Sequence, residues 1–184
     1  PSRPIDILVN NAGFGLARDF LDGDIADEER LLDVLCRAVL VLSHAGARGM
    51  RDRGHGQIIN VASVAAFAAM GTYSAAKSWV VVFTEGLSYE LTGTGVTATA
   101  LCPGFTHTEF HQRAQMNMTK LPEAMWLGVE ELVAACLDDV GKGRVVSVPG
   151  PIYKVMTGAL GIIPRPLVRR ATGLVSSRRR PRSE

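Results

Sequence analysis

Apolar and polar positions alternate in blocks along the chain. Four short runs rich in β-branched and small apolar residues each stop sharply at polar residues, glycine or proline, and they cover 5–9, 57–63, 96–102 and 144–148. The longer stretches between them carry apolar residues at helical spacing, over 29–50, 72–91 and 129–140. Strands separated by helices need crossover connections, which pair the strands in parallel. The pattern therefore predicts an α/β fold with a doubly wound parallel sheet and flanking helices.

Three of the four predicted strands end in polar or glycine-containing stops. These are Asn10–Gly13, Ser63 and the Pro103–Thr108 segment. In an open parallel α/β sheet, ligands bind outside the carboxyl ends of the strands. We therefore expect the three stops to lie at one edge and to form one site.

The stretch from Ser63 to Lys77 supplies candidate chemistry. Tyr73 and Lys77 are four residues apart, so a helix that begins near Thr72 places them on one face. A phenol has a pKa of about 10. A nearby ammonium favours the phenolate and lowers that pKa. With Ser63 holding a substrate oxygen, these residues could move a proton to or from an alcohol or carbonyl.

Four motifs in order resemble the classical short-chain dehydrogenase/reductase family. They are Asn10-Asn11-Ala12-Gly13, Ser63, Tyr73-Ser74-Ala75-Ala76-Lys77, and Pro103-Gly104 with Thr108. The resemblance covers roughly residues 5–150. It implies hydride transfer between a nicotinamide cofactor and a hydroxyl or carbonyl substrate, with a slight preference for NADP over NAD.

The resemblance also implies roles for single residues. Tyr73 would be the general acid/base, Ser63 would position the substrate oxygen, and Lys77 would lower the tyrosine pKa and bind the nicotinamide ribose. The loop of Asn10, Asn11, Ala12 and Gly13 would border the cofactor. Pro103, Gly104 and Thr108 would lie near the nicotinamide.

The chain departs from the family pattern in three ways. No glycine-rich phosphate loop precedes Asn10, which predicts a partial Rossmann-like sheet without its first strands over residues 1–150. Leu35 stands where the family usually carries an asparagine that holds a relay water. Ser63 and Tyr73 are ten residues apart, somewhat closer than is common in the family.

Residues 151–184 read as a separate apolar and basic tail. Net charge is +2, but seven arginines and one acid lie between Pro164 and Glu184. This composition suits either a contact helix followed by a disordered segment or peripheral contact with an anionic membrane. The arginines alone, without a recognition motif, do not indicate nucleic-acid binding. The absence of a signal-like segment and three widely spaced cysteines favour a cytoplasmic location.

Two other kinds of site are weaker interpretations. His107 and His111 are spaced i, i+4 and could face a metal on a helix, but the glutamate between them is misplaced for the known zinc motif. A substrate lid bearing both histidines is the preferred hypothesis. Ser63 lacks the Gly-x-Ser-x-Gly setting of a hydrolase nucleophile.

The sequence therefore predicts an NAD(P)-dependent oxidoreductase that interconverts a secondary alcohol and a ketone, on a lipophilic small molecule. The alternative is a catalytically impaired binding or interaction protein derived from that fold, because Leu35 and the missing glycine loop both weaken the site. The family resemblance also implies a homo-oligomer formed through the 72–91 helix and its neighbour.

Overall fold

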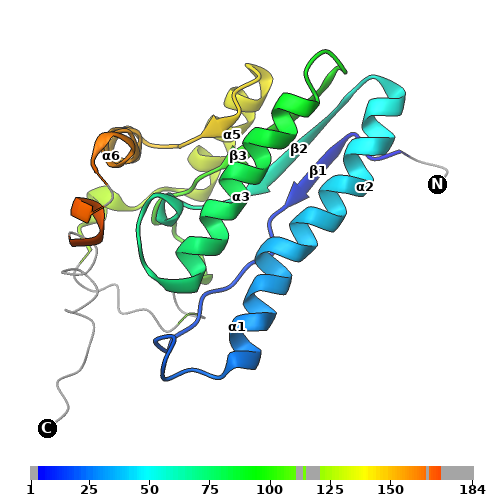
Figure 1. Cartoon of the computed structure of the whole chain (residues 1–184). Coiled ribbons are helices and arrows are strands. Elements are labelled where there is room, and N and C mark those ends of the chain that lie inside the picture. Colours follow the sequence, from blue (N-terminus) through cyan, green and yellow to red (C-terminus); the bar gives the residue numbers. More distant parts are fainter. Residues whose placement is uncertain (1–3, 111–113, 115–120, 165, 171–184) are drawn as a thin grey trace, which may run out of the picture.

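A computed structural model describes residues 4–110, 114, 121–164 and 166–170. Its sheet has the order β1 (Ile7–Asn10), β2 (Gly56–Val61), β3 (Val96–Leu101) and β4 (Val146–Ser147), as Figure 1 shows. All three strand pairs are parallel. The predicted α/β class and parallel sheet are therefore confirmed, with all four pairs of strand ends within two residues of the predicted ones.

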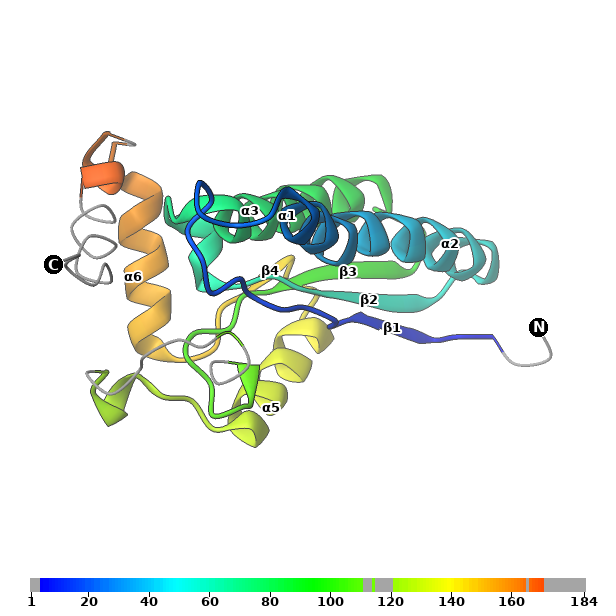
Figure 2. The same cartoon turned by 90° about the horizontal axis from the view of Figure 1, so that it is seen from below.

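Helices cover the two faces of the sheet unequally. One face carries α1 (Ile25–Leu32), a π-helical turn (Asp33–Arg37), α2 (Ala38–Arg53) and α3 (Gly71–Glu90). The other carries α5 (Val129–Gly141), while α6 (Pro151–Ile162) stands at the edge where the strands end (Figure 2). Two short 3-10 helices, Val64–Phe67 and Glu123–Met125, lie in the connections.

Helix ends follow the local chemistry of the chain. Asp24 caps α1, because its carboxylate accepts the Ala26 amide at 3.0 Å. Gly54 ends α2 at a φ of 77° in the left-handed region. A side chain at Gly95 would place its Cβ 2.0 Å from the Gly54 carbonyl oxygen, so the two turns meet only because residue 95 is glycine.

The core lies between the sheet and its helices. Val80, Ala100 and Cys102 are fully buried between α3 and β3. A second cluster joins Met50 of α2 with Ile58 of β2. On the opposite face, α5 packs onto β2 and β3, which fixes the ends of these strands and hence the loops that follow them.

A buried polar network ties four elements together. The amide of Asn10 donates to the side-chain oxygen of Asn60 at 2.7 Å and to the Ser43 hydroxyl at 3.1 Å. The Asn60 amide donates in turn to the Thr84 hydroxyl at 3.0 Å, which bonds the Val80 carbonyl. The network therefore links β1, α2, β2 and α3 at fixed positions.

Strand β1 is an edge strand that is covered on one face only. Its residues Ile7 and Val9 are each 51% exposed, whereas strands of parallel sheets are normally buried on both faces. Figure 2 shows helices above β1 and no described helix below most of its length. Val129, Val133 and Leu137 form an exposed apolar stripe on α5, the one helix of that face within the described residues.

The tail is described only in part. Residues 151–162 form α6, and 166–170 are helical, with Val168 buried. The basic segment that suggested membrane contact lies mostly in 171–184, outside the described residues. None of the helices in the described part of the chain combines the length and the apolar character needed to cross a bilayer.

Candidate functional site

The three predicted stops meet at one edge of the sheet. The parallel register pairs Asn10 with Asn60 and Val61 with Leu101, so the chain leaves β1, β2 and β3 at neighbouring points. The Ala62 amide bonds the Leu101 carbonyl at 2.7 Å, and the Val64 amide bonds the Pro103 carbonyl at 3.0 Å. These bonds hold the Ser63 segment beside the loop that follows β3.

Ser63 lies two residues beyond β2 in extended backbone and begins the 3-10 helix Val64–Phe67. Its hydroxyl accepts the Ala65 amide at 3.1 Å, which leaves its proton free for another acceptor. The short 3-10 helix also lets the chain enter α3 after only a few residues. The ten-residue separation from Tyr73 is therefore spanned by ordered structure.

Tyr73 lies in the first turn of α3, close to Ser63. Burial raises the pKa of the Tyr73 phenol, and a hydrogen bond with the Ser63 side chain acts in the opposite direction. The ring also faces Phe110, with ring centroids 5.9 Å apart. Tyr73 is therefore a neutral phenol with its hydroxyl next to a second hydroxyl, which suits proton donation.

Lys77 is buried one turn further along α3. Its ammonium donates to the Val61 carbonyl at 2.6 Å, and its side chain leaves only 4% of the residue exposed. Burial lowers the pKa of Lys77 to about 8, opposed by the nearby thiols of Cys36 and Cys102. The ammonium lies 5.8 Å from the Tyr73 ring centroid.

The expected lowering of the Tyr73 pKa by Lys77 is not seen in this structure. Desolvation of the phenol dominates, and Lys77 sits near the ring while it bonds a backbone carbonyl. The two side chains do share one face of α3, as their spacing predicts. Helix geometry thus brought them together, while burial decided the direction of both pKa shifts.

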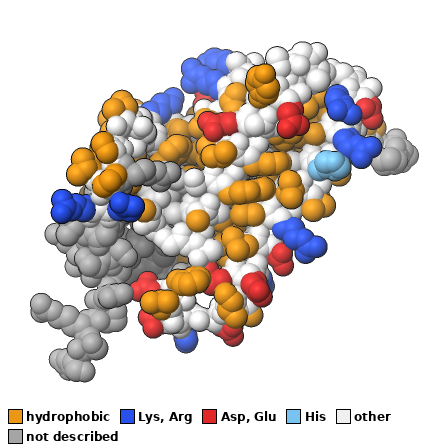
Figure 3. All heavy atoms as spheres, in the orientation of Figure 1, with side chains coloured by type: hydrophobic (Ala, Val, Ile, Leu, Met, Phe, Trp, Pro, Cys, Tyr) orange, Lys and Arg blue, Asp and Glu red, His pale blue; other side chains and the backbone are white. Residues whose placement is uncertain are grey.

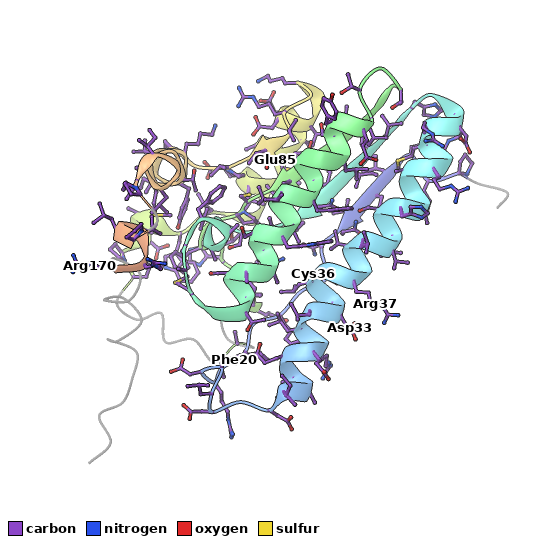
Figure 4. All side chains as sticks on the ribbon, viewed as in Figure 1. Phe20, Asp33, Cys36, Arg37, Glu85 and Arg170 are labelled. Carbon is purple, nitrogen blue, oxygen red and sulfur yellow. The ribbon has the colours of Figure 1, made fainter. Side chains whose placement is uncertain are left out.

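Leu35 fills space beside Tyr73 and Lys77. It is 1% exposed and lies in the π-helical turn between α1 and α2. Neighbouring Cys36 faces α3, where its thiol approaches the Ala76 carbonyl at 3.8 Å, and Figure 4 labels Asp33, Cys36 and Arg37 at this junction. Leu35 thus supplies an apolar wall near Lys77 and no hydrogen-bonding group.

The Asn10–Gly13 loop divides into an inward and an outward part. The Asn10 side chain belongs to the buried network below the sheet edge, whereas Asn11, Ala12 and Gly13 are exposed. A side chain at Gly13 would place its Cβ 3.0 Å from Leu35 and 3.7 Å from the Lys77 ammonium. Glycine therefore keeps open the approach to Lys77 from this loop.

The loop after β3 carries Pro103, Gly104 and Thr108. Thr108 is exposed, and its hydroxyl accepts the Phe110 amide at 3.3 Å. The structure adds Tyr153 of α6, whose ring covers Gly104 and whose hydroxyl accepts the Phe105 amide at 3.0 Å. No local pattern in the sequence pointed to Tyr153, because the contact joins residues 48 positions apart.

Of the two histidines proposed as metal ligands, the structure describes His107. His107 bonds the Glu123 carboxylate at 3.1 Å and stacks on Trp126, with ring centroids 4.6 Å apart. His111 lies outside the described residues, so the proposed pairing with His107 stays a prediction. Among the residues that the structure describes, no group of three metal-ligating side chains is found.

Two pockets lie beside α6 and not beside Tyr73. One of about 350 Å³ is lined by Phe67, Arg144 and Lys154, and one of about 300 Å³ by Phe67, Glu85 and Leu160. Neither includes Tyr73 or Lys77. In this chain the candidate site is therefore an open edge of the sheet. The chemistry of the clustered side chains in the described part of the chain identifies it.

The donor set at this edge fits a nicotinamide cofactor. The Lys77 ammonium has three donors, and one of them bonds Val61. Gly13 leaves room beside the ammonium for a further acceptor, such as a ribose hydroxyl. The Ser63 and Tyr73 hydroxyls lie together where a carbonyl oxygen could receive a proton.

A sequence model described as short chain dehydrogenase matches residues 2–119, well over half of the chain. The chain belongs to this family. The matched region includes Ser63, Tyr73 and Lys77, together with the loops after β1 and β3.

Similar proteins include reductases and a cofactor-bound enzyme. Acetoacetyl-CoA reductase of Rhizobium meliloti is 34% identical over 167 residues, which cover 82% of this chain and 68% of the relative. Ketoacyl reductase HetN of Nostoc is 34% identical over 105 residues, or 55% and 37% of the two chains. A short-chain dehydrogenase from Sphingobium yanoikuyae in complex with NADPH has a TM-score of 0.74 at 31% identity, covering 88% of this chain and 66% of that chain.

The chain thus spans between about one third and two thirds of the length of these short-chain dehydrogenases. The family is shown by the shared sequence and fold. The fold confirmed here is the part of the family's Rossmann-like fold whose helix α3 carries Tyr73 and Lys77.

Proposed function

We propose that this short-chain dehydrogenase chain carries the proton-transfer half of an NAD(P)-dependent oxidoreductase that interconverts a secondary alcohol and a ketone. The observation that carries the proposal is the cluster of Ser63, Tyr73 and Lys77 at the carboxyl edge of a parallel sheet. The hydrogen bond between Ser63 and Tyr73 and the burial of Lys77 support it.

In this proposal the residues of the chain handle the proton and the orientation of the substrate. A bound nicotinamide cofactor supplies or accepts the hydride. Ser63 holds the substrate oxygen, and Tyr73 gives its proton to that oxygen during reduction or takes it back during oxidation. The raised pKa of Tyr73 keeps the phenol protonated near neutral pH, which favours the reducing direction.

Lys77 would bind the nicotinamide ribose and serve as the cation near the Tyr73 ring. Its remaining donors and its place beside Gly13 support this role. The exposed backbone of Asn11 and Ala12 would border the cofactor, while the buried Asn10 side chain would fix the loop. Pro103, Gly104 and Thr108 would border the nicotinamide.

The substrate class follows from two features. The similar reductases act, by their names, on ketoacyl and acetoacetyl compounds. Phe110, which faces Tyr73, together with Phe14 and Leu16 near it, lines the approach with apolar surface. We therefore propose a lipophilic ketone, such as a β-ketoacyl thioester, with NADPH preferred over NADH as the NADPH complex of a similar structure supports.

The test combines nucleotide titration with turnover. The 184-residue chain is titrated with NADPH and NADH by fluorescence, and oxidation of each is followed with acetoacetyl thioesters and bulky ketones. Tyr73→Phe is expected to lower kcat by roughly 10²- to 10⁴-fold, because the proton donor is lost, with nucleotide affinity unchanged. Tyr89→Phe, at an 84% exposed position of the same helix, is the matched control.

Absence of nucleotide binding and of turnover in the wild type would reject the proposed function for this chain. Full activity of Tyr73→Phe would reject the proton role of Tyr73 alone.

A catalytically impaired binding protein is the second candidate. Leu35 favours it, since an apolar side chain fills the inner side of Lys77. The exposed face and free edge of β1 favour it too, because they remain available for another polypeptide. Nucleotide binding without turnover on any ketone tested would support this candidate.

We also propose that copies of the chain associate through α2 and α3. Leu40, Val41 and Val82 are 45–64% exposed on these helices, and Trp79 stacks on Phe83 with ring centroids 4.9 Å apart. Figure 3 shows hydrophobic side chains gathered on the face that α2 and α3 cover. Cytoplasmic location and peripheral membrane contact remain predictions from the sequence.

A further inference from the structure

We propose that Tyr153 is the positioning residue for the site, because it holds the Pro103–Thr108 loop in place from the neighbouring helix α6. This inference rests on the proposed function, in which that loop borders the nicotinamide. Figure 2 shows α6 at the edge of the sheet where the strands end. The hydrogen bond from the Phe105 amide to the Tyr153 hydroxyl places Tyr153 beside the loop.

The Tyr153 hydroxyl bonds two separate segments. It accepts the Phe105 amide at 3.0 Å and donates to the Met125 carbonyl at 2.5 Å. Both partners are backbone groups, so their positions follow the main chain. One buried hydroxyl therefore fixes the loop after β3 and the 3-10 helix Glu123–Met125 at the same time.

The Tyr153 ring sets the distance between the loop and α6. A side chain at position 104 would place its Cβ 2.1 Å from ring atoms Cε2 and Cζ, so the ring lies directly on the Gly104 backbone. Tyr153 is 1% exposed and cannot turn away into solvent. The requirement for glycine at 104 is thus explained by packing against Tyr153.

Further backbone bonds carry this constraint along the loop. The Leu127 amide bonds the Phe105 carbonyl at 2.8 Å, and the His107 amide bonds the Leu127 carbonyl at 3.2 Å. Thr106 and Leu127 form a parallel bridge between the two segments. Residues 105–107 and 125–127 therefore move as one unit that Tyr153 anchors.

The unit that Tyr153 anchors begins directly after Pro103 and Gly104. The Pro103 carbonyl accepts the amide hydrogen of Val64, the residue after Ser63. A shift of the loop would therefore move the backbone next to Ser63. Binding and catalytic groups must be held to a fraction of an ångström by the residues behind them. Loss of the Tyr153 hydroxyl should therefore act on the nicotinamide end of the cofactor and spare the rest.

The test uses Tyr153→Phe, which keeps the ring and removes only the hydroxyl. Thr157→Val is the matched control, because Thr157 is buried one turn later on α6 and bonds only backbone carbonyls of its own helix. Two quantities are measured in the full chain: the exchange rate of the Phe105 amide hydrogen, and the affinities for NADPH and for 2′-phospho-ADP-ribose, which lacks the nicotinamide.

In Tyr153→Phe the Phe105 amide should exchange about fivefold faster, since a hydrogen bond contributes about 1 kcal/mol. NADPH should bind about tenfold more weakly, with the affinity for 2′-phospho-ADP-ribose unchanged. Thr157→Val should leave all three quantities within about twofold of the wild type.

If Tyr153→Phe lowers the affinities for NADPH and 2′-phospho-ADP-ribose equally, the positioning role is overturned in favour of general destabilisation. The same holds if Thr157→Val changes the measured quantities as much as Tyr153→Phe does. Unchanged exchange at Phe105 would overturn it even if the wild type binds no nucleotide, so this result is separate from a failure of the proposed function.

Discussion

Lys77 is a buried cation with one described hydrogen-bond acceptor. Its ammonium bonds the Val61 carbonyl, and burial lowers the Lys77 pKa to about 8. Leu35 packs on the inner side, where it offers no acceptor to the charge. At the scale of single residues, the protonation of Lys77 is therefore set by how apolar its surroundings are.

Replacing Leu35→Asn should raise the Lys77 pKa by roughly 1, because an amide oxygen and the room it leaves for water favour the charged form. The Lys77 pKa can be followed by NMR titration of the side-chain carbon next to the ammonium. Leu31→Asn is the control, since Leu31 is equally buried in the same cluster. Leu35→Ala controls for the loss of volume. An unchanged Lys77 pKa in Leu35→Asn would show that the apolar wall does not control it.

At the scale of elements, polar side chains fix the strands and helices of the site relative to one another. Asn60 is fully buried on β2 and bonds Asn10 on β1 and Thr84 on α3. Asn10 precedes the exposed loop, so the network sets where that loop leaves the sheet. Asn10 thus acts through the scaffold beneath the loop that, in the proposed function, borders the cofactor.

Asn60→Ala should lower the free energy of unfolding by about 3 kcal/mol, because several buried polar groups each lose one hydrogen-bond partner. Ser43→Ala, which removes a more peripheral member at 3.4 Å from Asn60, should cost only about 1 kcal/mol. Urea unfolding measures both values. Equal losses in the two variants would contradict the central position of Asn60.

At the level of the whole fold, two apolar surfaces are exposed among the described residues. One is the face of α2 and α3, and the other is the lower face of β1 beside the stripe on α5. The chain spans about two thirds of the similar NADPH-bound structure, and the second surface lies at the edge strand of the shared sheet. The first surface is the one assigned to self-association.

Val41→Lys combined with Val82→Lys should convert the oligomer into a monomer, because two charges on the shared face oppose its burial. Sedimentation velocity gives the oligomeric state. Ile7→Lys on β1 is the control and should leave the state unchanged. A monomeric wild type, or dissociation by Ile7→Lys alone, would refute association through α2 and α3.

Three features could be predicted from the residue pattern alone: the class of fold, the helix that carries Tyr73 and Lys77, and the meeting of the polar strand ends at one edge. These follow from local periodicity and from the rule that parallel strands end on the same side. The motifs could likewise be recognised from short stretches of sequence. The family membership confirms the resemblance to short-chain dehydrogenases.

Only the tertiary structure decided the rest. The direction of the Tyr73 pKa shift depends on how deeply the phenol is buried, and the inward turn of Asn10 depends on partners 33 and 50 positions away. Tyr153 reaches Phe105 across 48 positions. Burial and long-range hydrogen bonds arise when distant segments pack together, and a pattern read along the chain contains no record of them.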